Sequence, residues 1–412
     1  MKIWQYTVIF LVILVSYLLY TPVPDGITEP FKYRRLVAGT RLLDLIVDAY
    51  DLIWPNHPND IHVYRTIPRL LMKTPPEVTP GSKFKASVTS FDGVDVRLYE
   101  PLHKRTELLP GFIYIHGGGY CIMNTELYDG LTRQMADELD AVVVSVEYRL
   151  SPDVKFPVPF EDTLKAVKWF FRHAKEYGVD VSRIGIGGDS AGGALTALTS
   201  QHLHDDKTLP DNKLQVLIYP SVQKINSWGP SYQKYEYNFG DGGMLSRKKT
   251  ARFLTYHMFG KVDEEFEKKY LENNHTSSEF KKSQKYHAIT DVSVIPEELR
   301  DPVYFSGPSN KDHGDPEMWA RIKDTVLDPR MSAMSRTDFS GLPEAFVATC
   351  GFDSLRDDGI LYSNVLREAG VKVKLVHYEE AFHGIFWIGP TFNFDLGVRM
   401  RKEAIEFIKQ KL

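Results

Sequence analysis

Three residues carry the side chains that a serine-based acyl transfer needs. Ser190 lies in the segment GDSAG (188–192), and Asp353 and His383 each follow a short apolar run. Such a reaction uses a hydroxyl nucleophile, a histidine that removes its proton and a carboxylate that orients the histidine. The chain order serine, aspartate, histidine is one of the orders in which these triads occur. We therefore predict that the three residues form a catalytic triad.

Two further aspartates lie close to the predicted acid. Asp357 and Asp358 follow Asp353 by four and five residues in the segment GFDSLRDD. Both fall where the next helix is expected to begin, and carboxylates at the N-terminus of a helix are stabilised by its dipole. Asp353 is therefore the preferred acid, with the other two as alternatives.

A glycine-rich segment, HGGG (116–119), supplies a candidate oxyanion hole directly after the apolar run FIYI. Without side chains, its backbone N–H groups can approach a substrate carbonyl closely, and one such donor is worth about 3 kcal/mol of transition-state stabilisation. The predicted oxyanion hole consists of Gly117, Gly118, Gly119 and Ala191. Among these, Gly118 and Gly119 are expected to be the first donors. His116 is expected to hold the loop in place and not to transfer protons.

These residues need a scaffold that brings several strand ends together. The sequence RIGIGGDSAGG (183–193) is typical of a strand, a sharp turn and a helix, because the glycines relieve clashes around a strained serine. Short apolar strands alternate with helices along much of the chain, a pattern typical of a parallel sheet covered on both faces. The carboxyl ends of such strands share one edge of the sheet, so Ser190, Asp353 and His383 are expected to meet there.

The expected strands number eight. A hairpin with its turn at Asp92-Gly93 opens the sheet over residues 84–101. The later strands are expected at 112–116, 141–148, 183–187, 213–220, 343–350 and 371–378. Helices are expected after Ser190 and at 124–140, 161–177, 360–369 and 395–412. The sequence therefore predicts an α/β fold with a mostly parallel eight-stranded sheet.

The alternation of strands and helices stops between about residues 221 and 340. This stretch is too long for a simple connection in a compact domain, so we predict an inserted cap. Residues 22–80, which are amphipathic in part, are expected to form the amino-terminal part of the cap, and residues 81–412 the catalytic domain. Aromatic residues of the insertion are candidates for an acyl pocket or for ordinary packing: Trp228, Tyr232, Tyr235, Tyr237, Phe239, Tyr256 and Phe259.

The amino terminus is the most apolar part of the chain. Residues 3–20 contain no charged side chain, and a helix of this length just spans a hydrocarbon core of roughly 30 Å. No small-residue cleavage site follows it, which favours an uncleaved transmembrane signal anchor over residues 1–21 above a cleaved signal peptide or a buried core helix. Basic residues on both sides of this segment leave its orientation open.

The composition excludes some classes of protein. With 412 residues, of which 43% are hydrophobic and 25% charged, the chain can bury a large core. Fifty basic and fifty-four acidic residues give a net charge of −4, and without a basic tract nucleic acid is not an expected partner. No set of histidine, cysteine and carboxylate ligands stands out, so neither a metal nor another cofactor is expected.

Two features bear on the cellular compartment. Asn274-His275-Thr276 is an acceptor sequence for N-glycosylation in a polar stretch, as expected for a lumenal surface loop. The only cysteines, Cys121 and Cys350, are both expected near the same end of the sheet. A disulfide and two buried thiols are both compatible with this placement.

Five motifs together resemble a known family. HGGGYC, YRLSPD, GDSAGG, DSLRDD and AFHG, in this order, are similar to the hormone-sensitive-lipase branch of the α/β-hydrolases. The apolar amino terminus and the cysteine directly after HGGGY resemble the group of arylacetamide deacetylase and neutral cholesterol ester hydrolase. The likeness covers nearly the whole chain.

The resemblance implies an α/β-hydrolase fold and a membrane-anchored serine esterase of the endoplasmic reticulum, with its catalytic domain in the lumen. It implies lipophilic esters or amides as substrates, such as arylacetamides or acylglycerols. It also implies a disulfide between Cys121 and Cys350. A binding protein on the same fold is the alternative, since relatives that lost a triad member act as receptors or adhesion domains. The intact set of Ser190, Asp353 and His383 favours the enzyme.

Overall fold

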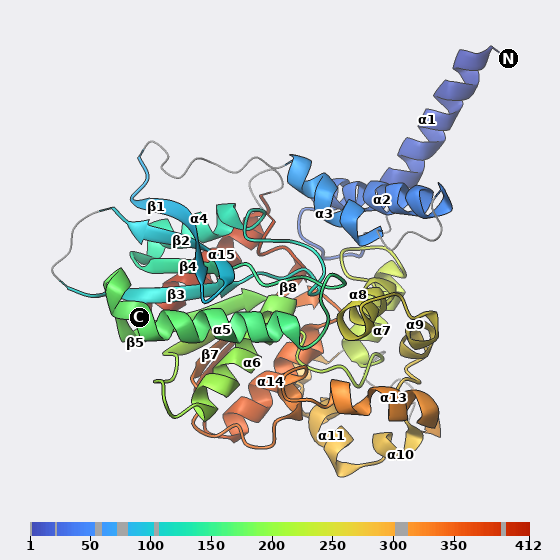
Figure 1. Cartoon of the computed structure of the whole chain (residues 1–412). Coiled ribbons are helices and arrows are strands. Elements are labelled where there is room, and N and C mark those ends of the chain that lie inside the picture. The colour runs from blue at the N-terminus through green and yellow to red at the C-terminus, as the bar shows by residue number, and fades with distance from the viewer. Residues whose placement is uncertain are drawn as a thin grey trace.

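The computed structural model describes residues 2–20, 23–53, 60–71, 81–102, 107–300, 312–388 and 393–412. A central sheet has helices on both faces, and a further group of helices lies at one end of its strands (Figure 1). The amino-terminal helix α1 projects away from this body.

The sheet contains eight strands in the order β1-β2-β4-β3-β5-β6-β7-β8. Their bounds are β1 Phe84–Phe91, β2 Val94–Pro101, β3 Leu109–Ile115, β4 Val142–Val146, β5 Val179–Asp189, β6 Leu214–Ile218, β7 Glu344–Phe352 and β8 Val373–Phe382. Strand β2 runs antiparallel to its neighbours β1 and β4, and the other neighbouring pairs are parallel. The prediction of a mostly parallel eight-stranded sheet is confirmed.

Each face of the sheet has its own apolar core. Helices α5 (Val158–His173), α6 (Ala191–Asp205) and α14 (Arg356–Glu368) cover one face, and α4 (Asp129–Leu139) and α15 (Asp395–Lys411) cover the other. Alternate side chains of a strand point to opposite faces. In β3, Ile113 and Ile115 accordingly join the core under α5 and α6, whereas Phe112 and Tyr114 join the core under α4 and α15.

Helix α4 begins later than the sequence predicts. The sequence predicts a helix over 124–140 with Asn124 or Thr125 as its cap, but the helix starts at Asp129. Asn124 still acts as a cap, because its side-chain oxygen accepts a hydrogen bond from the backbone N–H of Leu127 at 2.8 Å. That bond closes a separate turn ahead of the helix, and this turn shifts the start of α4 by several residues.

The residues between β6 and β7 form a helical layer at the carboxyl ends of the parallel strands (Figure 1). The α-helices described in this layer are α7 Pro230–Phe239, α8 Arg247–Phe259, α9 Glu264–Leu271, α10 Ser278–Lys281, α11 Gln284–Thr290 and α13 Pro316–Val326. Two helices from before the sheet, α2 Pro30–Ile53 and α3 Asp60–Leu71, lie beside this layer. Ile61 of α3 and Tyr256 of α8 share one apolar cluster with Cys121, so the two segments meet next to the glycine-rich loop. The exact domain boundaries stay a prediction.

Helix α1, Ile3–Leu19, occupies the segment where the sequence predicts a membrane anchor. Its side chains are mostly apolar and exposed. Among the residues described, no helix is both long enough and apolar enough to cross a membrane.

Candidate active site

The turn between β5 and α6 carries Ser190. The serine adopts φ 55° and ψ −120°, a strained conformation that lifts its side chain from the end of the strand. Close packing makes the flanking glycine necessary, because a Cβ atom on Gly192 would lie 2.1 Å from the carbonyl oxygen of Ile115. The backbone N–H of Ser190 donates to the carbonyl oxygen of Ile218 at 2.9 Å, which ties the turn to the neighbouring strand β6.

The structure brings the three predicted triad residues together. Nε2 of His383 lies 3.0 Å from Oγ of Ser190, and Nδ1 of the same ring lies 2.8 Å from Oδ2 of Asp353. The first distance suits a hydrogen bond between nucleophile and base, and the second suits one between base and acid. The other carboxylate oxygen of Asp353 accepts a bond from the backbone N–H of Leu355 at 2.8 Å, which fixes the carboxylate. All three residues of the set are buried, and Ser190, at 9% exposure, is not sealed off from solvent.

The two alternative acids have other partners. Oδ2 of Asp357 accepts a bond from the backbone N–H of Ser231 at 2.8 Å, and Oδ2 of Asp358 accepts one from the backbone N–H of Val222 at 3.2 Å. Both aspartates lie in the first turn of α14, as the sequence predicts. They hold that helix to the segment entering the helical layer, and Asp353 is the carboxylate that the fold brings to the histidine.

The glycine loop after β3 presents backbone donors. Gly118 and Gly119 have φ of 101° and 61°, values that favour glycine, and a Cβ atom on Gly118 would lie 2.2 Å from the carbonyl oxygen of Ile122. Among the described residues, no acceptor bonds the N–H of either glycine. Ala191 is the first residue of α6, so its N–H has no acceptor within the helix. These three N–H groups are therefore available to an oxyanion.

The prediction that Gly117 is an oxyanion donor is wrong. Its N–H already donates to Oδ1 of Asp189 at 3.1 Å and to the hydroxyl of Tyr128 at 3.2 Å. A Cβ atom on Gly117 would lie 2.7 Å from Oδ2 of Asp189. Gly117 is therefore the residue through which the loop is fastened to the protein.

His116 is completely buried beside the loop. Its Nδ1 lies 2.8 Å from the carbonyl oxygen of Gly117, and its ring stacks on Tyr148 with 4.3 Å between ring centroids. The hydroxyl of Tyr148 donates to the carbonyl oxygen of His116 at 2.9 Å. Burial lowers the pKa of His116, so the ring is neutral and Nδ1 carries the proton that it donates. These contacts shape the loop, in line with the role predicted for His116.

Asp189 is a positioning residue that sequence analysis missed. Its Oδ1 accepts from the hydroxyl of Tyr114 at 2.9 Å as well as from Gly117, and its Oδ2 accepts from the hydroxyl of Tyr128 at 2.8 Å. Burial raises the pKa of Asp189 to about 6, and the hydrogen bonds from Tyr128 and Tyr114 limit this rise because they stabilise the carboxylate. Asp189 directly precedes the nucleophile and thereby couples the serine turn to the glycine loop. Only the folded chain brings the two tyrosines to it, so the sequence held no signal.

We expect Asp189→Asn to lower kcat on the order of 100-fold with little change in KM. The amide keeps the shape but replaces an acceptor oxygen by a donor, so one of the bonds from Gly117, Tyr114 or Tyr128 is lost and the loop shifts. Steady-state kinetics on one ester, with a thermal unfolding curve, measure this. Tyr114→Phe is the control. It removes one hydrogen-bond donor to Asp189 without creating a clash, so it should lower kcat less than Asp189→Asn does. An unchanged kcat in Asp189→Asn would contradict the positioning role.

One side chain of the helical layer reaches the glycine loop, and it was not among the predicted aromatic residues. A Cβ atom on Gly119 would lie 2.4 Å from Cδ2 of Phe253 in α8, so the phenyl ring packs against this glycine. Of the predicted set, Tyr237 is exposed, whereas Tyr235 and Phe239 belong to the core under α4 and α15, where Phe239 packs on Tyr33 of α2. The remaining members are Tyr232 and Tyr256, which are buried, and Trp228 and Phe259, which are half-buried.

The disulfide implied by the family resemblance is not formed. Cys121 and Cys350 are both buried thiols. Cys350 lies in β7 and belongs to the core under α4 and α15, whereas Cys121 packs with Ile61 and Tyr256 below α3. The Sγ of Cys121 faces the carbonyl oxygen of Phe253 at 3.6 Å. The two side chains point into different apolar clusters, which is the physical reason that this prediction is wrong.

Asn274 lies between α9 and α10, where its Nδ2 donates to the carboxylate of Glu272 at 3.3 Å. The side chain of Asn274 is half-buried and that of Thr276 is buried. Glycosylation at this position stays a prediction.

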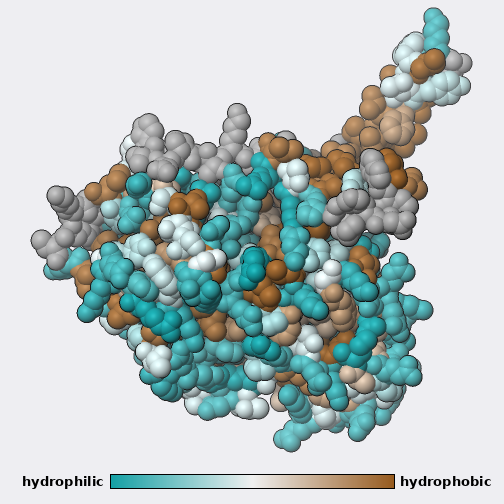
Figure 2. Space-filling model, viewed as in Figure 1, coloured by the Kyte–Doolittle hydropathy of each residue, from teal (hydrophilic) through white to brown (hydrophobic). Residues whose placement is uncertain are grey.

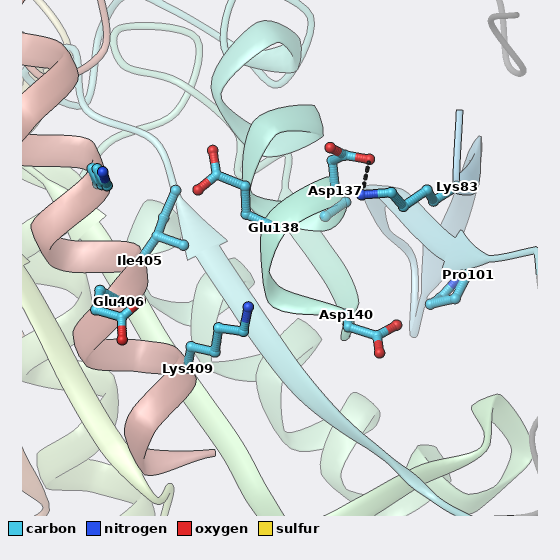
Figure 3. Close-up of a pocket in the computed structure, with 10 residues that line it drawn as sticks. Lys83, Pro101, Asp137, Glu138, Asp140, Ile405, Glu406 and Lys409 are labelled. Atoms are coloured by element: carbon cyan, nitrogen blue, oxygen red, sulfur yellow. Dashed lines mark ion pairs between the residues drawn. The ribbon is translucent and has the colours of Figure 1, made fainter. Parts of the chain in front are cut away.

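In the described part of the chain, two of the cavities lie near opposite ends of the strands. The larger, of about 500 Å³, lies between α4 and α15 near the start of β4, away from the edge that carries Ser190 (Figure 3). Charged side chains surround it, and Lys83 and Asp137 pair across it at 3.4 Å. The smaller, of about 390 Å³, lies between α3 and the segment after the glycine loop, where Met123 and Leu127 line it. Of these two cavities, the smaller lies next to the catalytic edge.

The fold and this constellation have known counterparts. Residues 112–291 and 309–387 match a family described as alpha/beta hydrolase fold, and the chain belongs to that family. Among solved structures, a hyperthermophilic esterase from the archaeon Pyrobaculum calidifontis is 26% identical, with a TM-score of 0.61 over 90% of this chain and 97% of that one. The carboxylesterase EstE1, from a metagenomic library, is 27% identical with a TM-score of 0.59 over 87% of this chain and 98% of that one.

Two curated relatives show to which group within this family the chain belongs. Arylacetamide deacetylase of Oryctolagus cuniculus is 35% identical over 98% of this chain and 99% of that protein. Neutral cholesterol ester hydrolase 1 of Mus musculus is 34% identical over 98% of each chain. Within the alpha/beta hydrolase fold family, the chain therefore belongs to the group that these two enzymes represent, as the motifs in its sequence indicate.

Proposed function

We propose that the protein is a serine hydrolase that cleaves carboxylic esters or amides of lipophilic substrates through an acyl-enzyme. The observation that carries the proposal is the chain of hydrogen bonds from Asp353 through His383 to Ser190, at 2.8 and 3.0 Å. Next to it, Gly118 and Gly119 offer N–H groups without an internal acceptor among the described residues. Its relatives are named for hydrolysing an amide and an ester.

The mechanism follows from this geometry. His383 accepts the hydroxyl proton on Nε2 as Oγ of Ser190 attacks the substrate carbonyl carbon. The negative charge that develops on the carbonyl oxygen is stabilised by the N–H groups of Gly118, Gly119 and Ala191, and Asp353 stabilises the imidazolium. His383 then returns the proton to the leaving alcohol or amine.

Deacylation repeats these steps with water. A water molecule loses a proton to Nε2 of His383 and attacks the carbonyl carbon of the acyl-enzyme. The second tetrahedral intermediate uses the same three N–H donors. Its collapse breaks the bond to Oγ, His383 returns the proton to Ser190, and the carboxylic acid leaves.

A substrate series tests this function. Purified wild-type protein is assayed against fatty acyl esters of increasing chain length and against one arylacetamide. We expect turnover of at least one of these classes, and the chain-length profile measures the size of the acyl site. A folded protein that hydrolyses none of them would contradict the proposal. It would favour the alternative, a catalytically silent binding protein with the same fold.

The proposal extends to location: helix α1 attaches the protein to the membrane of the endoplasmic reticulum, with the catalytic domain in the lumen. The exposed apolar side chains of α1 and the acceptor sequence at Asn274 support it. Protein expressed in animal cells should lose mass on treatment with an N-glycosidase, and Asn274→Gln should abolish the shift. Wild-type protein that shows no shift would contradict the lumenal placement.

A further inference from the structure

Helix α2 has apolar side chains on two opposite faces. The inward face packs on the protein through Tyr33, Val37 and Val47, which are buried. The outward face carries Phe31, Leu42, Ile46 and Ile53, which the structure leaves exposed. A surface helix normally has polar residues on the side away from the core, so the second apolar face is a candidate interaction surface.

The spacing of the outward residues shows that they form one stripe. Phe31, Leu42, Ile46 and Ile53 are separated by 11, 4 and 7 residues, intervals that return to the same side of an α-helix. Phe31 is 78% exposed and Ile53 is 63% exposed. Arg35 lies on the same side of the helix, between Phe31 and the other three. Isolated exposed apolar residues are common, but several on one side of a helix indicate an interaction surface.

Helix α1 extends this apolar surface. Its apolar side chains between Ile3 and Tyr17 are mostly exposed. Arg41 of α2 donates to the carbonyl oxygens of Tyr17 and Tyr20, so the end of α1 is fastened to α2. In Figure 2, apolar surface runs from α1 onto the region of α2 and α3. The end of α1 therefore lies next to α2, and a bilayer around α1 would come close to the stripe.

Charges on α2 favour lipid as that partner. Arg34 and Arg35 lie one turn from Phe31 and are exposed, and the guanidinium of Arg34 lies 6.0 Å from the centroid of the Phe31 ring. Apolar residues bordered by arginines are typical of helices in the interface of a bilayer, where the cations meet phosphate and the apolar side chains enter the acyl boundary. A protein partner has no comparable support in the described part of the chain.

We propose that the outward stripe of α2 (Phe31, Leu42, Ile46 and Ile53) lies in the headgroup region of a lipid bilayer, at the foot of α1. The inference rests on the proposed attachment of α1 to a membrane and adds a second, interfacial contact to it. The stripe is only one helical layer away from the active site, because α3 packs beside α2 and contacts Cys121 through Ile61. The inferred contact thus places the catalytic edge close to the bilayer surface.

The test uses the full chain and an environment-sensitive nitrobenzoxadiazole label on Ile46→Cys. The matched control is Val88→Cys, because Val88 is an exposed apolar residue, at 64%, on strand β1. Vesicles contain phosphatidylcholine with a fraction of phosphatidylserine. We expect a blue shift and quenching by spin-labelled lipid for the label at position 46, and neither for the label at position 88. Flotation of the vesicles measures attachment separately.

The possible outcomes separate the two proposals. If the protein floats with vesicles but the label at position 46 does not respond, the interfacial contact is overturned and attachment through α1 stands. If the protein does not float, both are overturned. Equal responses at positions 46 and 88 would show non-specific adsorption and overturn the inference. A dimer that Leu42→Glu makes monomeric would place a second copy of the chain on this stripe, and would also overturn it.

A second variant tests the consequence for activity. Leu42→Glu with Ile46→Glu should lower turnover of an ester dissolved in vesicles by about tenfold or more, the effect of losing one buried leucine-sized contact. Turnover of a short, water-soluble ester should stay unchanged, which also shows that the variant is folded. Equal turnover of the vesicle-bound ester by variant and wild type would contradict the inference.

Discussion

Ser190→Ala is expected to lower kcat by on the order of 10⁶-fold while leaving the protein folded. The variant loses only the hydroxyl, so His383 has no proton to accept and no acyl-enzyme forms. The small alanine side chain fits the same turn, because the close contacts at the turn involve the backbone of Gly192. Turnover of the best ester of the substrate series measures the loss, and a thermal unfolding curve checks the fold.

Ser221→Ala is the matched control for this loss. Ser221 lies beside the nucleophile, since its backbone N–H donates to the carbonyl oxygen of Ser190 at 3.3 Å. Its own hydroxyl accepts a bond from Nζ of Lys224 at 2.7 Å, and among the described residues Nε2 of His383 bonds the hydroxyl of Ser190 instead. The control should therefore keep most of the activity. A large loss of kcat in Ser221→Ala, with activity retained in Ser190→Ala, would show that Ser221 is the nucleophile.

Asp353→Asn should lower kcat by roughly 10⁴-fold. The carboxylate accepts the proton on Nδ1 of His383 and so keeps Nε2 free to accept the proton of Ser190. An amide in this position can donate to Nδ1, which favours the tautomer with its proton on Nε2 and removes the base. The pH dependence of kcat and its absolute value, measured on one ester, test this change.

The alternative acids provide controls for the assignment of Asp353. Asp357→Asn and Asp358→Asn keep an acceptor oxygen for the backbone N–H groups of Ser231 and Val222. Because neither aspartate bonds His383, both variants should stay within about tenfold of wild-type kcat once folding is verified. A drop of the Asp353→Asn size in either of them, with Asp353→Asn still active, would show that the acid was assigned wrongly.

Local signals were sufficient to predict the triad. Each of the three residues is the first after a strand: Ser190 follows β5, Asp353 follows β7 and His383 follows β8. In the sequence, the apolar runs place these strand ends to within two to four residues, and in a parallel sheet the ends share one edge. The sheet itself was predicted for the same reason, since its buried strands are continuous apolar runs.

Features that depend on contacts between distant segments were not predictable. The N–H of Gly117 is used by Asp189 and Tyr128, and no sequence pattern distinguishes it from the N–H groups of its neighbours. Phe253 reaches the loop only because α8 packs there. Likewise, proximity to one end of the sheet did not decide whether the cysteines pair, because pairing depends on which face each side chain occupies.

The central claim is that Ser190 is a nucleophile activated by His383, and covalent labelling tests it most directly. Wild-type protein, Ser190→Ala and His383→Ala are treated with a fluorophosphonate, and the modified peptide is identified by mass spectrometry. We predict one adduct per wild-type chain, on Ser190, and no adduct on either variant in the same time. An adduct on another serine, or a folded wild-type protein that does not react, would contradict the account.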